Sequence, residues 1–300
     1  MPSLDPGLLE WAVRAAAPGA EVAEVRGLRD GGSPWLVRLG RDGRHGVVLR
    51  VGGARDRPAL GTEVAALRLA AEHRLPAPRL LAAELDGDPP VVLVEQLEGS
   101  SAIPADRPPA RLRTLGRAAA ALHAIALAPG PALPRRDRPI ASEDFAALRR
   151  RPPVRTLLLE AEARLAGPRA READVFVHGD LWQGNALWLG DTLTGLVDWD
   201  CAGAGPPGVD LGSLRCDAAV CFGLEAADDV LAGWEELAGR PAVDVAHWDV
   251  VAALSTPPDM GWFAGAIAGQ GRPDLAREVL VRRRDAFLLA ALGRLDAGTG

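Results

Sequence analysis

The sequence contains no lysine and no tyrosine. All 34 of its basic residues are arginine, and its aromatic residues are eight tryptophans and five phenylalanines. A site that usually relies on a lysine ammonium group or a tyrosine hydroxyl must therefore use another side chain here.

Cysteine and long apolar stretches are also scarce. The three cysteines are an odd number without metal-ligand spacing, which argues against a disulfide framework. Apolar runs such as Val91–Val94 are far too short to span a bilayer. Near the N-terminus, Asp5 and Glu10 stand where a signal peptide would have a basic region and an apolar block. We therefore expect a cytoplasmic protein that does not contact the membrane.

The overall composition is that of a globular protein with two domains. The 300 residues are 48% hydrophobic and 25% charged, and this length is sufficient for two lobes. The net charge of −6 argues against nucleic acid as the main partner, and it is compatible with a cationic substrate.

Patterns of strands dominate the first third of the chain. Leu60, Val64, Leu67 and Ala71 have helical spacing and predict a helix over 59–73. A first helix is expected over 8–17, and the expected strands are 22–28, 35–39, 46–51 and 91–94. We predict a mainly antiparallel sheet with a helix in segment 1–98.

Helical patterns dominate the rest, after a Ser-, Pro- and Ala-rich connection over 99–109. The expected helices are 110–128, 142–150, 154–166 and further helices from Gly223 to the end. A compact β region, Val175–Trp199, interrupts them. The whole chain is therefore predicted to have an α+β fold, with a sheet lobe over 1–98 and a mostly helical lobe over 99–300.

The most informative stretch is the β region. Val175–Val177 predicts a strand, and the loop after it carries His178-Gly179-Asp180 and then Asn185. Two further strands are expected, 186–189 and 194–199, joined by a turn at Gly190-Asp191, and the pairing of the strands is predicted with the turn centred between Asp191 and Thr192.

This hairpin would place Asn185 opposite Asp198. An amide oxygen beside a carboxylate is a partial site for Mg²⁺, which takes one or two protein oxygens and completes its shell with water and phosphate. Asp180 lies close enough in the sequence to act on a substrate hydroxyl beside that ion. An acid next to a metal site is what phosphoryl transfer requires. The alternative is an acidic turn with ordinary solvated carboxylates.

The segments HGDLWQGN, LVDWD and GVDLGSL resemble the aminoglycoside phosphotransferase and choline kinase superfamily, which is related to protein kinases. The resemblance implies a bilobal protein-kinase-like fold that uses ATP, with GTP not excluded, and Mg²⁺. It implies that Asp180 is the catalytic base, that Asn185 and Asp198 are magnesium ligands, and that Asp210 steadies the catalytic loop. The chain departs from the family at Trp182-Gln183, where His-Pro is common, and at Gly205-Pro206-Pro207, where Gly-Asp-Pro is usual.

The same resemblance extends to the nucleotide site. Arg50 lies in a strand of alternating pattern where such kinases usually have a lysine that holds the phosphates, and Glu63 stands on the next helix as its partner. A guanidinium binds phosphate bidentately and keeps its charge, so Arg50 suits this role; the alternative is a solvated strand residue. Two further predictions are phosphate contact by Gly31, Gly32 and Ser33, which otherwise form a plain hairpin turn, and adenine contact by the main chain of Glu95 and Leu97.

The predicted activity is transfer of the γ-phosphate of ATP to a hydroxyl group of a small molecule, such as an aminoglycoside-like antibiotic, an amino sugar or an amino alcohol. The alternatives are a metabolic kinase for choline, ethanolamine, homoserine or a sugar, and a nucleotide-binding pseudokinase. Acids and tryptophans after Leu211 would suit a cationic acceptor, unless they are surface acids and core tryptophans. They are Trp234, Trp248, Trp262, Glu225, Asp228, Asp229, Glu235, Glu236, Asp249 and Asp259.

Overall fold

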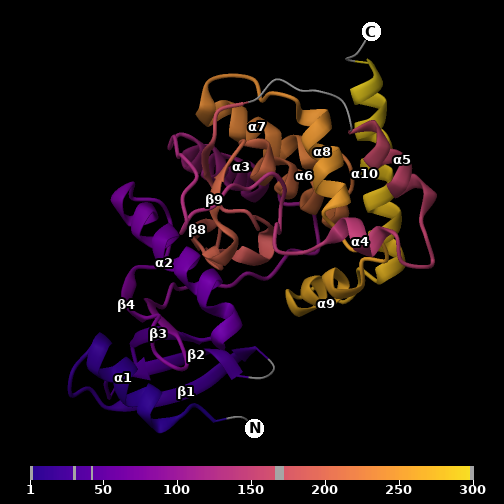
Figure 1. The fold of residues 1–300 in the computed structure, drawn as a ribbon. Coiled ribbons are helices and arrows are strands. Elements are labelled where there is room, and N and C mark those ends of the chain that lie inside the picture. Colours follow the sequence, from indigo (N-terminus) through magenta and orange to yellow (C-terminus); the bar gives the residue numbers. More distant parts are fainter. Residues whose placement is uncertain (1–2, 30–31, 42, 166–171, 298–300) are drawn as a thin grey trace. The chain divides into compact units, whose positions relative to one another are not determined.

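The computed structural model describes residues 3–29, 32–41, 43–165 and 172–297 (Figure 1). The chain forms two compact units. The first comprises Met1–Glu98 together with Thr194–Asp200, and the second comprises Gly99–Leu193 and Cys201–Gly300. The segment with Asp198 is therefore part of the first unit, although it follows the catalytic loop in sequence. That segment 1–98 is a nucleotide-binding lobe stays a prediction.

The first unit is built on a five-stranded sheet with the order β1-β2-β3-β5-β4, in which neighbouring strands are antiparallel. The strands are β1 (Val22–Arg29), β2 (Gly32–Leu39), β3 (His45–Val51), β4 (Leu80–Glu84) and β5 (Val91–Glu95), and the helices are α1 (Pro6–Ala16), η1 (Ala54–Asp56) and α2 (Arg57–Glu72). The short apolar runs expected to be strands are strands. The sequence prediction missed β4, whose side chains are only partly buried or exposed.

Strand β3 sends alternate side chains to opposite faces of this sheet. Val47 and Leu49 are fully buried in a core that also contains Ala12 of α1. Arg50, the residue after Leu49, lies on the other face, where its guanidinium meets Glu63 of α2. The predicted alternation therefore places Arg50 on the α2 face.

Two hydrogen bonds to main-chain oxygens help to attach segment Thr194–Asp200 to the rest of the first unit. The Thr194 hydroxyl donates to the carbonyl oxygen of Glu98 at 2.6 Å, and the Leu196 N–H donates to the carbonyl oxygen of Pro76 at 2.7 Å. These bonds hold the residues on either side of Leu196, including Asp198, with the sheet.

The second unit is mostly helical. Its helices are α3 (Pro109–His123), α4 (Phe145–Arg149), α5 (Thr156–Arg164), α6 (Gly208–Phe222), α7 (Ala226–Ala238), α8 (Val245–Leu254), α9 (Gly261–Gly269) and α10 (Arg277–Ala297). Helix α6 packs against α7, α8 and α10, and α3 packs on α7 (Figure 1). The helix expected over 110–128 ends at His123, and the chain then extends so that the Ile125 carbonyl oxygen accepts a hydrogen bond from Phe176.

Short strands frame the catalytic loop. β6 (Val175–Val177) pairs with β9 (Gly203–Gly205), and β7 (Ala186–Leu189) pairs with β8 (Thr192–Leu196). The loop between β7 and β8 is Gly190-Asp191, as predicted, and Gly190 takes the left-handed conformation (φ 58°) that suits a two-residue turn. The centre of the turn lies one residue before the expected point between Asp191 and Thr192. Asp198 consequently follows the end of β8 instead of lying within it.

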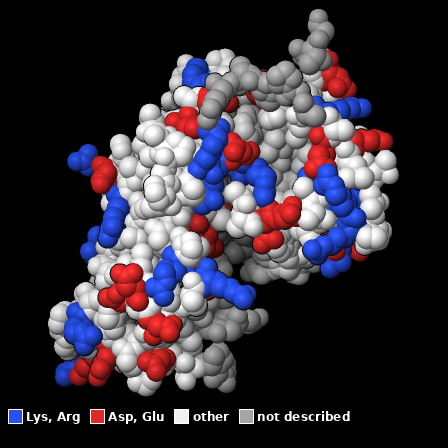
Figure 2. Space-filling view, viewed as in Figure 1, with Lys and Arg blue, Asp and Glu red and all other residues white. Residues whose placement is uncertain are grey.

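Together these elements confirm the predicted α+β arrangement of an antiparallel sheet followed by helices. Within the described ranges, no helix combines the length and apolar character needed to cross a bilayer. The face seen in Figure 2 carries arginine and acidic side chains intermingled. Ion pairs within the second unit include Arg164 with Asp296 and Arg155 with Asp285.

Candidate functional site

The catalytic loop begins at the buried end of β6. Phe176, Val177 and His178 have no exposed surface, and the chain turns at the buried Gly179 before it leaves the core at Asp180. Gly179 has φ +80°, and a Cβ atom there would lie 2.0 Å from the Cys201 carbonyl oxygen. Only glycine fits this turn, and the turn brings the partly buried side chain of Asp180 to the edge of the unit.

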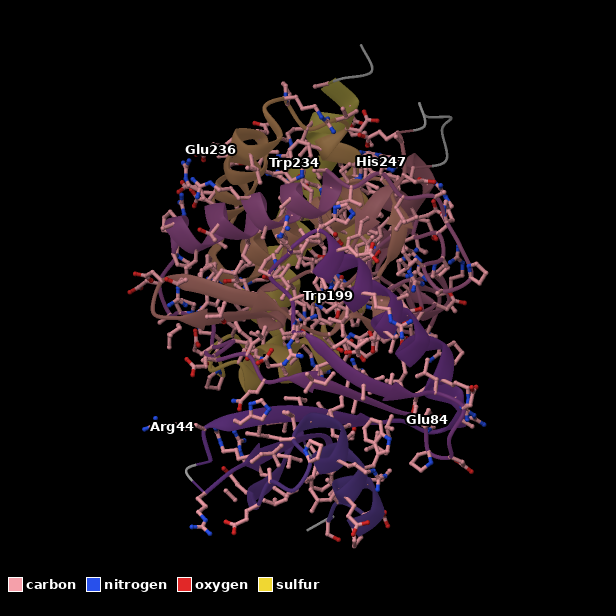
Figure 3. The ribbon with its side chains drawn as sticks, turned by 90° about the vertical axis from the view of Figure 1, so that its left-hand side faces the viewer. Arg44, Glu84, Trp199, Trp234, Glu236 and His247 are labelled. Carbon is pink, nitrogen blue, oxygen red and sulfur yellow. The ribbon has the colours of Figure 1, made fainter. Side chains whose placement is uncertain are left out.

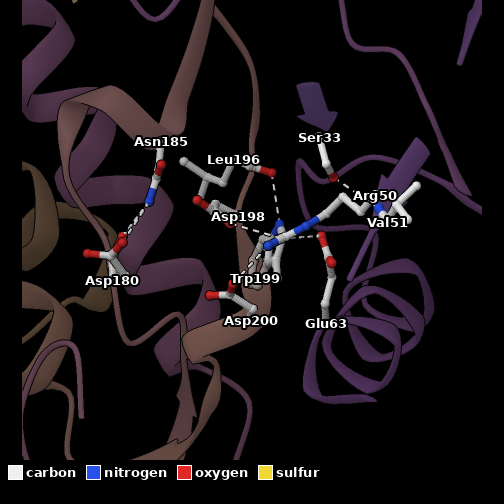
Figure 4. Close-up of polar contacts among 10 residues, drawn as sticks. All are labelled: Ser33, Arg50, Val51, Glu63, Asp180, Asn185, Leu196, Asp198, Trp199 and Asp200. Carbon is white, nitrogen blue, oxygen red and sulfur yellow. Dashed lines mark hydrogen bonds and ion pairs between the residues drawn. The ribbon is translucent and has the colours of Figure 1, made fainter. Parts of the chain in front are cut away.

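Asn185 orients Asp180 at the other end of the loop. Its amide nitrogen Nδ2 donates to the main-chain oxygen of Asp180 at 2.8 Å and to carboxylate oxygen Oδ2 at 3.2 Å (Figure 4). Asn185 is 5% exposed and belongs to the short η2 helix (Gln183–Asn185). With Nδ2 used in this way, the amide oxygen Oδ1 is the atom that suits a hard cation.

Asp210 holds the first half of the loop from the N-terminus of α6. It is completely buried, its Oδ2 accepts the His178 N–H at 2.7 Å, and its Oδ1 accepts the Gly179 N–H at 2.8 Å. Hydrogen bonds to a charged group are the stronger ones, and the first turn of a helix favours a negative charge. This geometry is what a loop-steadying role requires.

A histidine and a tryptophan support Asp210 from two other helices. The indole N–H of Trp234 in α7 donates to Nδ1 of His123 in α3 at 2.9 Å, so Nδ1 is an acceptor. The imidazole proton then resides on Nε2, which lies 3.3 Å from Asp210 Oδ2 and donates to it. Figure 3 shows Trp234 among the helices, and at 1% exposure it is a core residue, not part of an acceptor surface.

In the first unit, Arg50 joins three carboxylates. Its Nη1 lies 3.0 Å from Glu63 Oε1 and 2.9 Å from Asp198 Oδ1, and its Nη2 lies 2.9 Å from Asp200 Oδ2 (Figure 4). A lysine has a single nitrogen and could not bridge in this way. Asp200 was not singled out from the sequence, although its place two residues after Asp198 was a signal.

The charges in this cluster do not balance. Burial raises the pKa of Glu63 to about 7, although Arg50 pulls it back down. Burial alone would lower the pKa of Arg50, but Glu63, Asp198 and Asp200 outweigh it and the pKa rises. One guanidinium facing three acids leaves an excess of negative charge, which a bound cation would offset. Asp198 also has a left-handed backbone (φ 67°), a conformation that costs energy and is concentrated at functional sites.

The residues fit the predicted magnesium site by their chemistry. The amide oxygen of Asn185 and the carboxylate of Asp198 are hard oxygen donors, and Mg²⁺ needs only one or two from the protein. In the described part of the chain, no three His, Cys, Asp or Glu side chains form a metal cluster of their own. The two donors belong to different units, so their facing each other stays a prediction.

The other predicted nucleotide contacts lie along the sheet. Gly31 falls outside the described residues, while Gly32 and Ser33 begin β2. The Ser33 hydroxyl accepts the Val51 N–H at 3.0 Å and is thus used within the sheet. Their phosphate contact stays a prediction.

The expected adenine contacts lie at the end of β5 and just beyond it. The Glu95 N–H is bonded to Arg79. For Leu97, the described ranges contain no main-chain hydrogen bond, so its N–H and C=O are available to a base.

The acidic side chains proposed for a cationic acceptor are already engaged. Six of them pair with arginines: Glu225 and Asp229 with Arg107, Asp228 with Arg215, Glu236 with Arg117, Asp249 with Arg215 and Arg294, and Asp259 with Arg277. The seventh, Glu235, accepts the Ala242 N–H. Trp248 packs over Gly208, and Trp262 is 47% exposed. The reading as surface acids and core tryptophans therefore fits most of this set better than an acceptor surface does.

Comparison with solved structures finds antibiotic phosphotransferases. The chain is similar to macrolide 2'-phosphotransferase MphH from Brachybacterium faecium, with a TM-score of 0.62 and 19% identity over 92% of this chain and 97% of that one. It is similar to AMP-bound spectinomycin phosphotransferase APH(9)-Ia, with a TM-score of 0.62 and 12% identity over 96% and 99%. It is also similar to APH(3'')-Id from Streptomyces rimosus in complex with ADP and streptomycin, with a TM-score of 0.52 and 20% identity over 83% and 99%.

These similarities confirm the predicted protein-kinase-like fold. A comparison with curated protein sequences gave no match. The profile of the phosphotransferase enzyme family matches residues 24–254, which is well over half of the 300 residues. The matched range contains Arg50, the catalytic loop and Asp198. The chain therefore belongs to the phosphotransferase enzyme family, and it is an enzyme that transfers phosphate to hydroxyl groups.

Proposed function

We propose that this phosphotransferase moves the γ-phosphate of ATP to a hydroxyl group of a small molecule, with Asp180 as the catalytic base. The observation that carries the proposal is the 2.9 Å contact between Arg50 and Asp198, which are 148 residues apart in the sequence. It joins the cation expected to hold phosphate to the carboxylate expected to hold magnesium. Each of the two side chains is 20% exposed, so they are mostly withdrawn from water and differ in this from solvated strand and turn residues.

The proposal assigns a task to each of these residues. Asp180 accepts the proton of the acceptor hydroxyl while the hydroxyl oxygen bonds to the γ-phosphorus and the bond to the bridging oxygen of ADP breaks. Asn185 holds the Asp180 carboxylate in place through Nδ2. Arg50, positioned by Glu63, compensates phosphate charge. Mg²⁺, held by Asn185 Oδ1 and Asp198, would neutralise charge on the phosphates.

The acceptor is a hydroxyl compound of modest positive charge, or none. Polycationic aminoglycosides require acids that are free to bind them, whereas six of the acids considered for this purpose are bound to arginines. An amino sugar, an amino alcohol or a metabolite such as choline or homoserine remains compatible. So does a weakly charged antibiotic such as a macrolide.

An acceptor panel tests the proposal. Purified enzyme with ATP and Mg²⁺ is incubated with aminoglycosides, macrolides, choline, ethanolamine, homoserine and sugars, and ADP release is measured. Transfer to one class that disappears in Asp180→Asn, with nucleotide affinity retained, supports the proposal. Nucleotide binding without transfer to any acceptor or to water would favour a pseudokinase. Asp180→Asn with full activity would remove the residue from the base role.

A further inference from the structure

The catalytic loop is tied to helix α6 at a second point besides Asp210. Asp217 lies seven residues after Asp210 on α6, close to two helical turns, so both carboxylates are on the same side of the helix. Asp210 receives the N–H groups of His178 and Gly179. Asp217 receives two hydrogen bonds from Gln183, near the other end of the loop.

The two bonds from Gln183 converge on one oxygen. Asp217 Oδ2 accepts the Gln183 main-chain N–H at 3.2 Å and the side-chain amide Nε2 at 2.8 Å. Gln183 is 6% exposed, so neither donor has ready access to water if the carboxylate is removed. The other oxygen, Oδ1, lies 3.7 Å from the Cys221 sulfur one turn further along α6.

Gln183 stands where related catalytic loops commonly carry proline. A proline there has no N–H and no side-chain donor, so it could make neither bond. Gln183 therefore supplies both donors, and Asp217 supplies an acceptor that such a loop would not need. Burial raises the pKa of Asp217 to about 6, so keeping a carboxylate at this position is costly without a compensating role.

The hydrogen bonds between Gln183 and Asp217, called the tether below, act on Asp180 and Asn185, the two loop residues with proposed roles in phosphoryl transfer. Gln183 begins the η2 helix that ends at Asn185, and a three-residue helix of this type has little stability of its own. The Asn185 N–H bonds to the Trp182 carbonyl oxygen at 3.1 Å, and its side chain holds Asp180. Trp182 in turn packs partly buried against the helical core, which leaves Gln183 as the polar attachment of this half of the loop.

We propose that Asp217 and Gln183 are a pair of positioning residues that fix the Asp180–Asn185 segment for phosphoryl transfer. The proposal rests on the proposed role of Asp180 as base. It predicts a larger effect on the rate of transfer than on nucleotide affinity, because the segment carries the proposed base Asp180, while Arg50 belongs to the other unit and still holds phosphate.

Two measurements on three variants test this proposal, and one of the variants swaps the hydrogen-bond donor and acceptor. Hydrogen exchange of the peptide covering 178–189 reports the loop directly, without any acceptor, and steady-state kinetics report kcat and KM for ATP. The variants are Asp217→Ala, Gln183→Glu, and Gln183→Glu combined with Asp217→Asn. The combined variant reverses donor and acceptor, since an asparagine can donate to the glutamate while its oxygen accepts the main-chain N–H. Ser213→Ala, on the same helix, is the matched control.

In Asp217→Ala and in Gln183→Glu, hydrogen exchange of the loop peptide is expected to be about tenfold faster and kcat about tenfold lower, with a smaller change in KM for ATP. The combined variant should recover most of both effects. Unchanged exchange in the single variants, faster exchange with unchanged kcat, or a combined variant no better than Gln183→Glu would each overturn the proposal. If the wild-type enzyme transfers phosphate to nothing, the proposed function fails, while the exchange data still decide whether the tether exists.

Discussion

Replacing Asp210 with asparagine is expected to loosen the catalytic loop more than it alters the fold around it. Each Asp210 oxygen accepts one main-chain N–H, at 2.7 and 2.8 Å, and His123 Nε2 donates to Oδ2 as well. Asparagine has one oxygen and one amide group in the same space. Whichever way it is oriented, its NH₂ group faces an N–H donor, and one main-chain N–H is left buried without an acceptor.

The cost follows from these contacts. An unsatisfied buried donor costs about 1–3 kcal/mol, and the remaining bond weakens by about 1 kcal/mol when its acceptor loses the charge. The expected loss in free energy of unfolding is about 2–4 kcal/mol, because the site is fully buried and water cannot replace the lost partner. This is below the total stability of a typical domain, so the variant should stay folded at 25 °C.

A matched control separates stability from positioning. Asp249 is as completely buried as Asp210 and is bonded to Arg215 and Arg294, away from the catalytic loop. Urea unfolding followed by tryptophan fluorescence should show a loss of stability in both Asp210→Asn and Asp249→Asn. Only Asp210→Asn should also lower kcat, by about tenfold or more, with KM for ATP little changed. A stability change below about 0.5 kcal/mol, or equal losses of kcat in both variants, would refute the reasoning.

Three further predictions concern the first unit. Arg50→Lys loses the contact from Nη2 to Asp200, so KM for ATP should rise about tenfold, and further in Arg50→Ala; an unchanged KM would remove Arg50 from the phosphate site. The pKa of Glu63 rises from 4.5 to about 7 on folding. The native state then binds the extra proton, and the free energy of unfolding of the wild type relative to Glu63→Gln should fall by about 3 kcal/mol from pH 4.5 to pH 7. A flat difference in urea unfolding across that range would contradict this sign. Asp198→Ala should abolish the magnesium-dependent part of nucleotide binding in calorimetry, whereas Asp180→Asn should not; equal effects would mean that the two roles are misassigned.

The structure shows where sequence patterns fail to predict elements of this fold. Helix α6 was not predicted because it is buried on nearly all sides, and a helix without a polar face has no amphipathic period. Strand β9 is Gly203-Ala204-Gly205, which has no β-branched or aromatic residue to indicate a strand. Both elements are essential to the site, since α6 carries Asp210 and β9 pairs with β6 at the start of the loop.

For the acceptor, the sequence left two interpretations open for a different reason. Acids and tryptophans that are close in sequence suggested a cationic pocket, but their meaning depends on distant partners. Asp229 pairs with Arg107 and Trp234 with His123, each more than 100 residues away. The sequence shows how many acidic residues a segment has, but it does not show which of them form ion pairs with arginines.

By itself the sequence determined what is local. The alternation of β3 placed Arg50 on one face of the sheet, and the loop from His178 to Asn185 carries the proposed base, the amide and the obligatory glycine within eight residues. Tertiary structure alone decided which groups are joined. Asp200 completes the guanidinium fork, Trp234 sets the tautomer of His123, and Asp217 receives Gln183. Hydrogen bonds and ion pairs act over about 3 Å in space, and proximity of that kind between residues far apart in the chain exists only after the helices and strands have packed.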